Sequence, residues 1–242
     1  EIYTLSLHDA LPISIHVKTG KDAAPMVRWA RKHGMTATIH TGGPSIAGSN
    51  AITAEVVLEA DPDVVGHVNG GTTSMSEREI DALVATRMAL EIVHCGNGKA
   101  ALHALRRARE AKATHRIIVG LDAPSGTGVV PLGILRVLAH LVSLGGVAPE
   151  EAVCMATGNT ARVYKLPVGV IAPGREADFC IVDAPIGSQG RTALEALQVG
   201  DLFGVSMIVI DGQIKIGRSR NTPPATRAAE VVKGQGPAAG GH

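Results

Sequence analysis

The sequence is poor in aromatic residues and in net charge, and each shortage excludes a class of function. Aromatic residues make up 2% of the 242 residues, too few for the stacking platforms on which proteins bind single-stranded nucleic acids. The formal net charge of +1 gives no electrostatic reason to expect a nucleic acid or an anionic membrane surface as a partner. The length suits one large domain, or a large domain with a small one.

Cysteine is also scarce, and the apolar runs are short. Cys95, Cys154 and Cys180 form no CxxC pair, so we expect neither a disulfide framework nor a cysteine-based zinc site. Free thiols are typical of a reducing compartment, which predicts a cytoplasmic protein. The sequence contains no apolar run of about 18 residues that could span a membrane.

What the sequence does contain is an alternation of short apolar runs with amphipathic stretches. The apolar runs predict buried strands, and the amphipathic stretches, which begin near a Thr, Ser or Gly, predict helices. The expected strands are residues 35–40, 63–68, 88–94 and 116–122, and the expected helices between them are 54–59, 76–85 and 99–112. Another helix, ending at a Gly stop, precedes the first of these strands. Such an alternation predicts right-handed βαβ units and a parallel sheet.

The expected strand ends recur at a constant interval. His40, His67 and His94 follow one another at intervals of 27 residues, and Leu121 follows after 27 more. A constant strand-to-strand step is typical of a (β/α) barrel, in which all strand carboxyl ends open on one face. Because four strands are half of eight, we expect residues 15–165 to form the C-terminal half of a (β/α)8 TIM barrel. The same step places the preceding strand end at Ile13.

The chain changes character after this α/β part. Residues 131–143 and 149–164 predict two helices, and the β-rich runs 168–183 and 205–216 are broken by the turn signals Pro-Gly and Asp-Gly. We therefore expect a small β portion over residues 166–220. Residues 221–242 are rich in Pro, Ala and Gly, and predict a partly disordered tail with one short helix at 226–232.

Three residues at strand ends have the chemistry of a metal site. His40 and His67 begin the segments HTGG and HVNGG, in which the glycines leave room for a ligand. Asp122 follows another apolar strand and begins a run of small residues. Two imidazoles and one carboxylate that face one point would bind a divalent metal, with zinc or iron the natural choices. His94 lacks the Gly-Gly pair, and we expect it to line a substrate pocket with Cys95 and Asn97.

These residues, with the segments DAPSGTGVVPLGILR and NTARVYKLPVGVIAPGREADFCIVD, resemble the amidohydrolase superfamily. The superfamily comprises metal-dependent hydrolases on a (β/α)8 barrel with a small β domain. Within it, the similarity is densest to the hydrolases that open cyclic enamides in nicotinate degradation, and it extends over residues 15–232. It implies an enzyme that hydrolyses a non-peptide C–N bond in a small cyclic amide.

The resemblance also implies the roles of individual residues. His40 and His67 would bind one ion of a binuclear zinc or iron centre, and Asp122 the other. Metal-bound hydroxide would attack the ring carbonyl, with Asp122 as the general base. Asn69, His94, Asn97 and Ser125 are candidates for substrate contacts. We also expect the intact protein to be a homo-oligomer.

The family pattern is incomplete in this sequence, which contains neither the H-x-H pair nor the bridging carboxylate that the family places on earlier strands. Residues 1–14 have no clear period and resemble translated sequencing-adapter read-through. We therefore expect them to be non-native, the rest to be the C-terminal part of a longer enzyme, and the 242-residue chain to be inactive by itself. A divergent native N-terminus is the alternative.

Two other functions stay open. One is a related barrel enzyme with the same ligand frame, such as a dihydroorotase-like hydrolase or a deaminase, because specificity lies in loops. The other is a non-catalytic scaffold or an inactive fragment.

Overall fold

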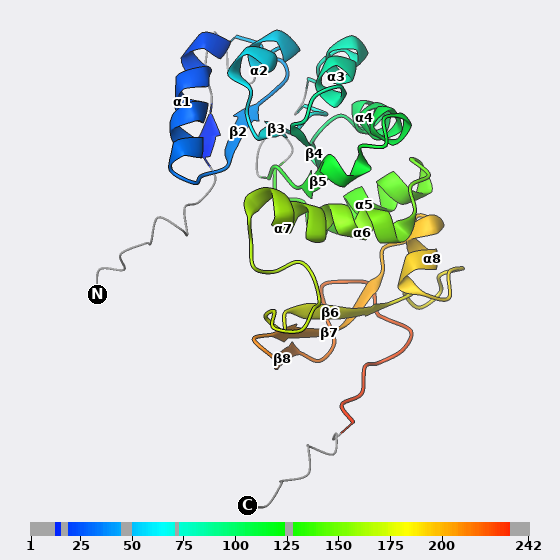
Figure 1. Cartoon of the computed structure of the whole chain (residues 1–242). Coiled ribbons are helices and arrows are strands. Elements are labelled where there is room, and N and C mark those ends of the chain that lie inside the picture. Colours follow the sequence, from blue (N-terminus) through cyan, green and yellow to red (C-terminus); the bar gives the residue numbers. More distant parts are fainter. Residues whose placement is uncertain (1–12, 16–18, 45–49, 71–72, 124–127, 233–242) are drawn as a thin grey trace, which may run out of the picture.

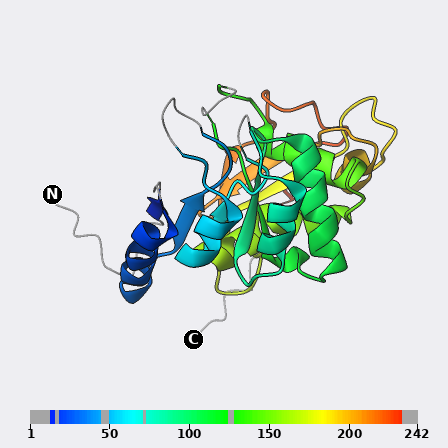
Figure 2. The same cartoon turned by 90° about the horizontal axis from the view of Figure 1, so that it is seen from above.

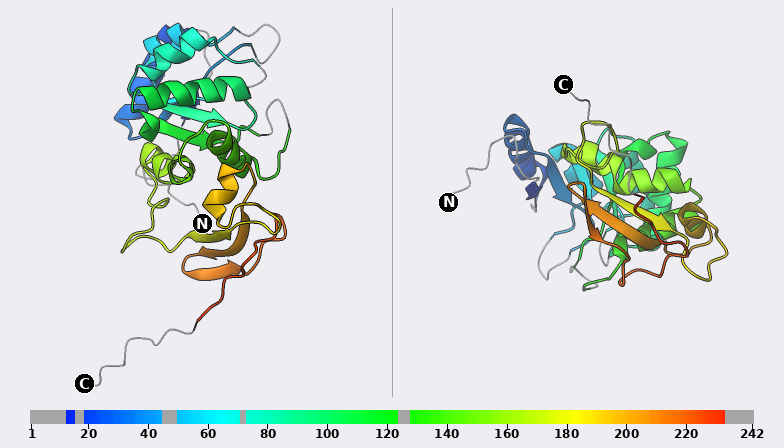
Figure 3. Two further views of the ribbon diagram at one scale, coloured as in Figure 1. Left: turned by 90° about the vertical axis from the view of Figure 1, so that its right-hand side faces the viewer. Right: turned by 90° about the horizontal axis from the view of Figure 1, so that it is seen from below.

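The computed structural model describes residues 13–15, 19–44, 50–70, 73–123 and 128–232 (Figure 1). An α/β part comes first along the chain and is followed by a small antiparallel sheet at the other end of the molecule (Figure 3). None of the helices in the described ranges has the length and apolar character needed to cross a membrane. Cys95, Cys154 and Cys180 are free thiols.

The α/β part is built on a five-stranded sheet in which every neighbouring pair is parallel. Its order follows the chain: β1 (Ile13–Ile15), β2 (Ala37–His40), β3 (Val64–Gly66), β4 (Ala89–Val93) and β5 (Ile117–Gly120). The predicted parallel sheet is therefore confirmed, and β2 to β5 lie inside the four expected strands. The strand β1 lies where the 27-residue step placed an earlier strand end, and it includes two residues of the segment 1–14.

A row of helices joins these strands and covers one face of the sheet (Figures 1 and 2). Sequence signals fix several of their starts: Thr19 and Asn97 accept hydrogen bonds from backbone N–H groups of the first turn, and Ser76 forms a capping box with Glu79. A 3-10 turn, η2 (Thr114–Arg116), leads into β5. The helices that join the strands are α1 (Gly20–Lys32), α2 (Ala54–Ala60), α3 (Glu77–Val84) and α4 (Gly98–Glu110), and α5 (Gly133–Ser143) follows β5.

The two faces of the sheet have different neighbours. Side chains alternate along each strand, so that Ile39, Val65 and Leu90 pack into the main core beneath the helices. Val64, Ala89 and Ile118 point to the opposite face, where Val163 and Tyr164 pack against them. Burying the strands on both faces explains their nearly continuous apolar sequences.

The prediction of one helix over residues 149–164 was wrong. The segment forms α6 (Pro149–Ala156) and α7 (Gly158–Tyr164), which are separated at Thr157, whose backbone is not helical (φ −123°, ψ −91°). The amide of Asn159 donates to the carbonyl oxygen of Ile117 at 3.0 Å and so ties α7 to the start of β5. This tertiary anchor turns α7 toward the second face of the sheet, where its last residue, Tyr164, packs.

The small sheet has the antiparallel order β6 (Phe179–Asp183), β7 (Gly204–Ile210) and β8 (Gln213–Ile216). The predicted Asp-Gly turn joins β7 to β8, with positive φ at both Asp211 and Gly212, as a two-residue hairpin requires. Residues 168–178, which were expected to be β-rich, contain no strand. The connection between β6 and β7 contains a helix that we did not predict, α8 (Ala193–Gln198).

Residues 221–232 contain no helix, so the short helix expected at 226–232 was a wrong prediction. Asp183 accepts hydrogen bonds from the backbone N–H and the guanidinium of Arg227. Ala229 N–H donates to Ser206 Oγ at 2.6 Å. These bonds to β6 and β7 use the backbone groups that a helix would need for its own hydrogen bonds.

Candidate functional site

The carboxyl edge of the parallel sheet brings together the predicted site residues. His40 is the last residue of β2, His67 and His94 directly follow β3 and β4, and Asp122 lies two residues after β5. Because the strands are parallel, all four residues lie at the same edge. The connections that follow this edge contain residues 45–49, 71–72 and 124–127, which are not among the described residues, so the prediction for Ser125 lies outside them.

His40 and His67 contact each other directly. The Nε2 atom of His67 lies 2.7 Å from the Nδ1 atom of His40, and the rings cross at 75° with centroids 4.4 Å apart. His67 is buried and His40 is half-buried. Two imidazoles on adjacent strands thus turn a ring nitrogen toward the same point.

This pair fits two ligands of one divalent ion. Two nitrogens bound to a tetrahedral zinc at about 2.0–2.1 Å would lie about 3.3 Å apart, so small rotations of the rings would make room for the ion. Among the described residues, however, no three His, Cys, Asp or Glu side chains form a group that could hold a metal. The pair therefore supplies part of a metal site, which needs further ligands.

Asp122 lies at the same edge in a left-handed backbone conformation, with φ 56°. It is half-buried, and it interacts electrostatically with Glu91 on β4. Burial, followed by the charge of Asp122, raises the pKa of Glu91, while a hydrogen bond from the His67 N–H opposes that rise.

Sequence analysis missed Glu91. Its side chain accepts a hydrogen bond from the backbone N–H of His67 at 3.1 Å. The available signal was its position: Glu91 is the charged residue in the otherwise apolar run MALEIVH, and a carboxylate on a buried strand needs a partner.

The two asparagines are engaged in holding the edge together. Asn69 is fully buried, and its amide exchanges two 3.0 Å hydrogen bonds with the backbone of Val93. Asn97 caps α4 by accepting from Ala100 N–H at 3.0 Å. These contacts give both residues a structural role, and their contact with substrate stays a prediction.

His94 is half-buried beside the start of α5, where a Cβ on Gly133 would lie 3.5 Å from its ring. Burial lowers the pKa of His94, and the nearby charges of Arg136 and His140 lower it further. A neutral imidazole is therefore favoured at this edge, which is suited to accepting a hydrogen bond or a proton.

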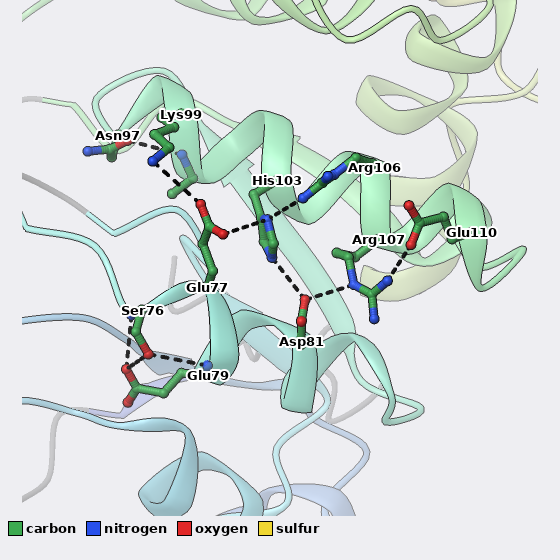
Figure 4. Close-up of polar contacts among 11 residues, drawn as sticks. Ser76, Glu77, Glu79, Asp81, Asn97, Lys99, His103, Arg106, Arg107 and Glu110 are labelled. Atoms are coloured by element: carbon green, nitrogen blue, oxygen red, sulfur yellow. Dashed lines mark hydrogen bonds and ion pairs between the residues drawn. The ribbon is translucent and has the colours of Figure 1, made fainter.

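His103 belongs to a polar cluster between α3 and α4 (Figure 4). Its ring lies 2.9 Å from Asp81 and 2.9 Å from Arg106, and Arg107 also binds Asp81. These contacts give His103 a structural role.

Comparison with known proteins identifies the family. Residues 12–215 match the amidohydrolase family. The chain belongs to this family. It is 52% identical over 217 residues to the enamidase of Eubacterium barkeri, and the match covers 89% of this chain and 56% of that protein. A crystal structure of enamidase, described as a member of the amidohydrolase superfamily, matches the same shares of the two chains with a TM-score of 0.86.

Proteins of lower similarity also match. Adenine deaminase 1 of Latilactobacillus sakei is 32% identical over 115 residues, which is 46% of this chain and 18% of that protein. Atrazine chlorohydrolase of Arthrobacter aurescens, solved with zinc, has a TM-score of 0.53 and 18% identity over 90% of this chain and 51% of that chain; this likeness shows the fold alone. The chain thus spans little more than half the length of the enamidase.

Proposed function

We propose that this chain is part of an enamidase-like hydrolase that opens a cyclic amide at its C–N bond. The observation that carries the proposal is the 52% identity to enamidase, which extends over 89% of the chain and so includes the segments at the carboxyl edge. The His40 and His67 pair supports it, because it supplies the nitrogen donors that this chemistry needs. We further propose that the five parallel strands belong to a (β/α)8 barrel completed by residues that the 242-residue chain does not supply.

His40 and His67 would hold a divalent ion, zinc or iron, as part of a binuclear centre. When bound, such an ion acts as a Lewis acid toward a carbonyl oxygen and lowers the pKa of water toward about 7. Family members generally depend on divalent metals. The remaining ligands would come from outside the described residues.

Asp122 would act as the general base. Its carboxylate would accept a proton from the attacking water and deliver it to the ring nitrogen as the C–N bond breaks. The residues that follow Asp122 in the sequence are mostly small, which supports a substrate site beside it. His94 would face the substrate as a neutral imidazole, and Asn69, Asn97 and Ser125 remain proposed substrate contacts.

A second candidate is a deaminase that hydrolyses the exocyclic C–N bond of a purine. It is favoured by the matches to adenine deaminases, one of which reaches 57% identity over 42 residues. That match covers 17% of the chain, however, and the enamidase match covers 89%. The cyclic amide is therefore the better-supported substrate, and a homo-oligomeric, cytoplasmic enzyme remains our expectation.

A chimera tests the two candidates. The part of the Eubacterium barkeri enamidase that lies outside the matched region is joined to this chain. This fusion protein is called the chimera below. It is supplied with zinc or iron and incubated with a panel of six-membered cyclic amides and with adenine, and products are followed by mass spectrometry. We expect ring-opened acids, a gain of one water, and no hypoxanthine. Deamination of adenine without ring opening would overturn the proposal.

A further inference from the structure

Glu91 is the half-buried, charged residue of β4, whose other four residues are buried. It lies on the second face of the sheet, with Ala89 and Val93, because side chains alternate along a strand. Ala89 on that face packs with Ile118 and against Tyr164. A carboxylate among such neighbours is costly unless it has a specific hydrogen-bond partner.

The partner of Glu91 is the backbone at the end of β3. The N–H of His67 donates to Oε2 of Glu91 at 3.1 Å, and the next N–H, that of Val68, donates to the backbone carbonyl oxygen of Glu91 at 2.7 Å. One residue of β4 therefore binds two consecutive peptide groups. These groups flank the Cα atom that carries the imidazole facing His40.

The backbone of His67 needs such a restraint. Its φ of 40° lies in the left-handed region, which residues with a side chain rarely adopt. The turn that begins at His67 is closed by the N–H of Gly70, which donates to the carbonyl oxygen of His67 at 2.6 Å. An unfavourable conformation persists only where surrounding contacts fix it, and Glu91 provides the contact to the His67 N–H.

The neighbouring strand leaves space for this carboxylate. A Cβ atom on Gly120 of β5 would lie 2.5 Å from Oε1 of Glu91 and 3.1 Å from its carboxyl carbon. The first of these distances is too short for non-bonded atoms, so a side chain at position 120 would displace the carboxylate. Gly120 and Glu91 therefore form one unit, in which the glycine allows the carboxylate to reach His67.

We propose that Glu91 is a positioning residue, which fixes the backbone of His67 so that its imidazole faces His40 as a metal ligand. The inference rests on the proposed function in one respect, the assignment of His67 as a ligand. Glu91 acts through the His67 peptide group and does not touch the ion. Outer contacts of this kind typically change metal affinity by about 10- to 100-fold.

The test uses two readouts on the purified 242-residue chain and on the chimera, which supplies the part of the enzyme that this chain lacks. Cobalt(II) affinity is measured by visible absorption, and hydrogen exchange of the His67 amide is measured without metal. In Glu91→Leu, which removes the acceptor, we expect affinity to fall by about 10- to 100-fold and the His67 amide to exchange roughly tenfold faster or more. Glu91→Gln keeps an acceptor oxygen and should restore both values.

Two further variants separate positioning from a loss of stability. Gly120→Ala keeps the Glu91 side chain but pushes its carboxylate away from the His67 N–H. This variant should therefore reproduce both effects of Glu91→Leu. Ile92→Ala removes the adjacent β4 side chain, which is buried on the helix-covered face. It should lower the melting temperature while leaving cobalt affinity and His67 exchange unchanged.

The outcomes distinguish the two proposals. If Glu91→Leu leaves both readouts unchanged, or if Ile92→Ala alters them as strongly, the positioning role is refuted. If neither the unaltered chain nor the unaltered chimera binds cobalt, the assignment of His67 as a ligand fails. In that case His67 exchange still decides whether Glu91 fixes its backbone.

Discussion

His40 and His67 are 27 residues apart in sequence, and a ring nitrogen of one lies 2.7 Å from a ring nitrogen of the other. The contact follows from the parallel pairing of β2 with β3, in which His40 is opposite Gly66, the residue before His67. The glycine is needed because a Cβ at position 66 would lie 2.8 Å from the carbonyl oxygen of Ile39. The two strands approach closely where the two imidazoles meet.

Metal binding by the 242-residue chain should depend on both rings. We expect His40→Ala and His67→Ala each to abolish measurable zinc binding in isothermal titration calorimetry, because one imidazole alone cannot hold the ion. His33→Ala is the matched control, since His33 lies at the other end of β2, where its ring contacts Trp29. Equal zinc binding by all three variants would show that the ion binds elsewhere.

Gly66→Ala should destabilise the protein through its backbone contact. The added methyl group would meet the Ile39 carbonyl oxygen and the Thr38 methyl group at 2.8 and 2.9 Å, and overpacking of this kind costs roughly 1–3 kcal/mol. Gly98→Ala is the control, because its nearest contact would be the His140 ring at 3.5 Å. Urea unfolding should give a clear loss of stability for the first variant and little change for the second.

The ion pair between Asp183 and Arg227 should make stability depend on pH in the acid range. Hydrogen bonds from Arg227 hold the pKa of Asp183 well below its usual range, and this outweighs the opposing effect of burial. A carboxyl whose folded pKa lies below its unfolded value, about 3.9, stabilises the fold fully above that value. The contribution is lost as the pH falls toward the folded pKa.

Asp183→Asn should therefore lower the free energy of unfolding by roughly 1–3 kcal/mol at pH 7, and by progressively less below about pH 4. Urea unfolding at pH 7, 4 and 3 measures this. Asp178→Asn is the control, because an asparagine oxygen can still accept the hydrogen bond that Asp178 receives from Asp211 N–H. A loss for Asp183→Asn that is the same at every pH would contradict the assignment.

The positions of the strands and of the histidines could be predicted from the sequence because both depend on local patterns. Apolar runs define β2 to β5, and a parallel sheet brings His40, His67 and Asp122 to one edge whatever the details of packing. The 27-residue step even located β1. These predictions needed no knowledge of which side chains touch.

The features that were missed depend on contacts between distant residues. The break at Thr157 follows from the Asn159 bond to β5, and the lack of a helix at residues 226–232 follows from the Arg227 bonds to Asp183. Glu91 was overlooked because its partner is a backbone N–H on another strand, which leaves no sequence motif. Such tertiary bonds override local propensity.

Replacing Asp122 in the chimera should remove the general base without removing the fold. Asp122→Asn keeps the size of the side chain but cannot accept the proton, so we expect kcat to fall by roughly two to four orders of magnitude. Asp81→Asn, in the cluster between α3 and α4, is the control and should leave kcat unchanged. Unaltered turnover in Asp122→Asn would remove this residue from the mechanism.

The most direct test of the central claim is ring opening of a cyclic amide by the chimera in water enriched in oxygen-18. The account predicts one labelled oxygen in the new carboxylate, loss of activity after treatment with a chelator, and recovery when zinc or iron is returned. It also predicts no activity in His67→Ala, and none from the 242-residue chain alone. Ring opening that persists in the chelated chimera or in His67→Ala would contradict the account.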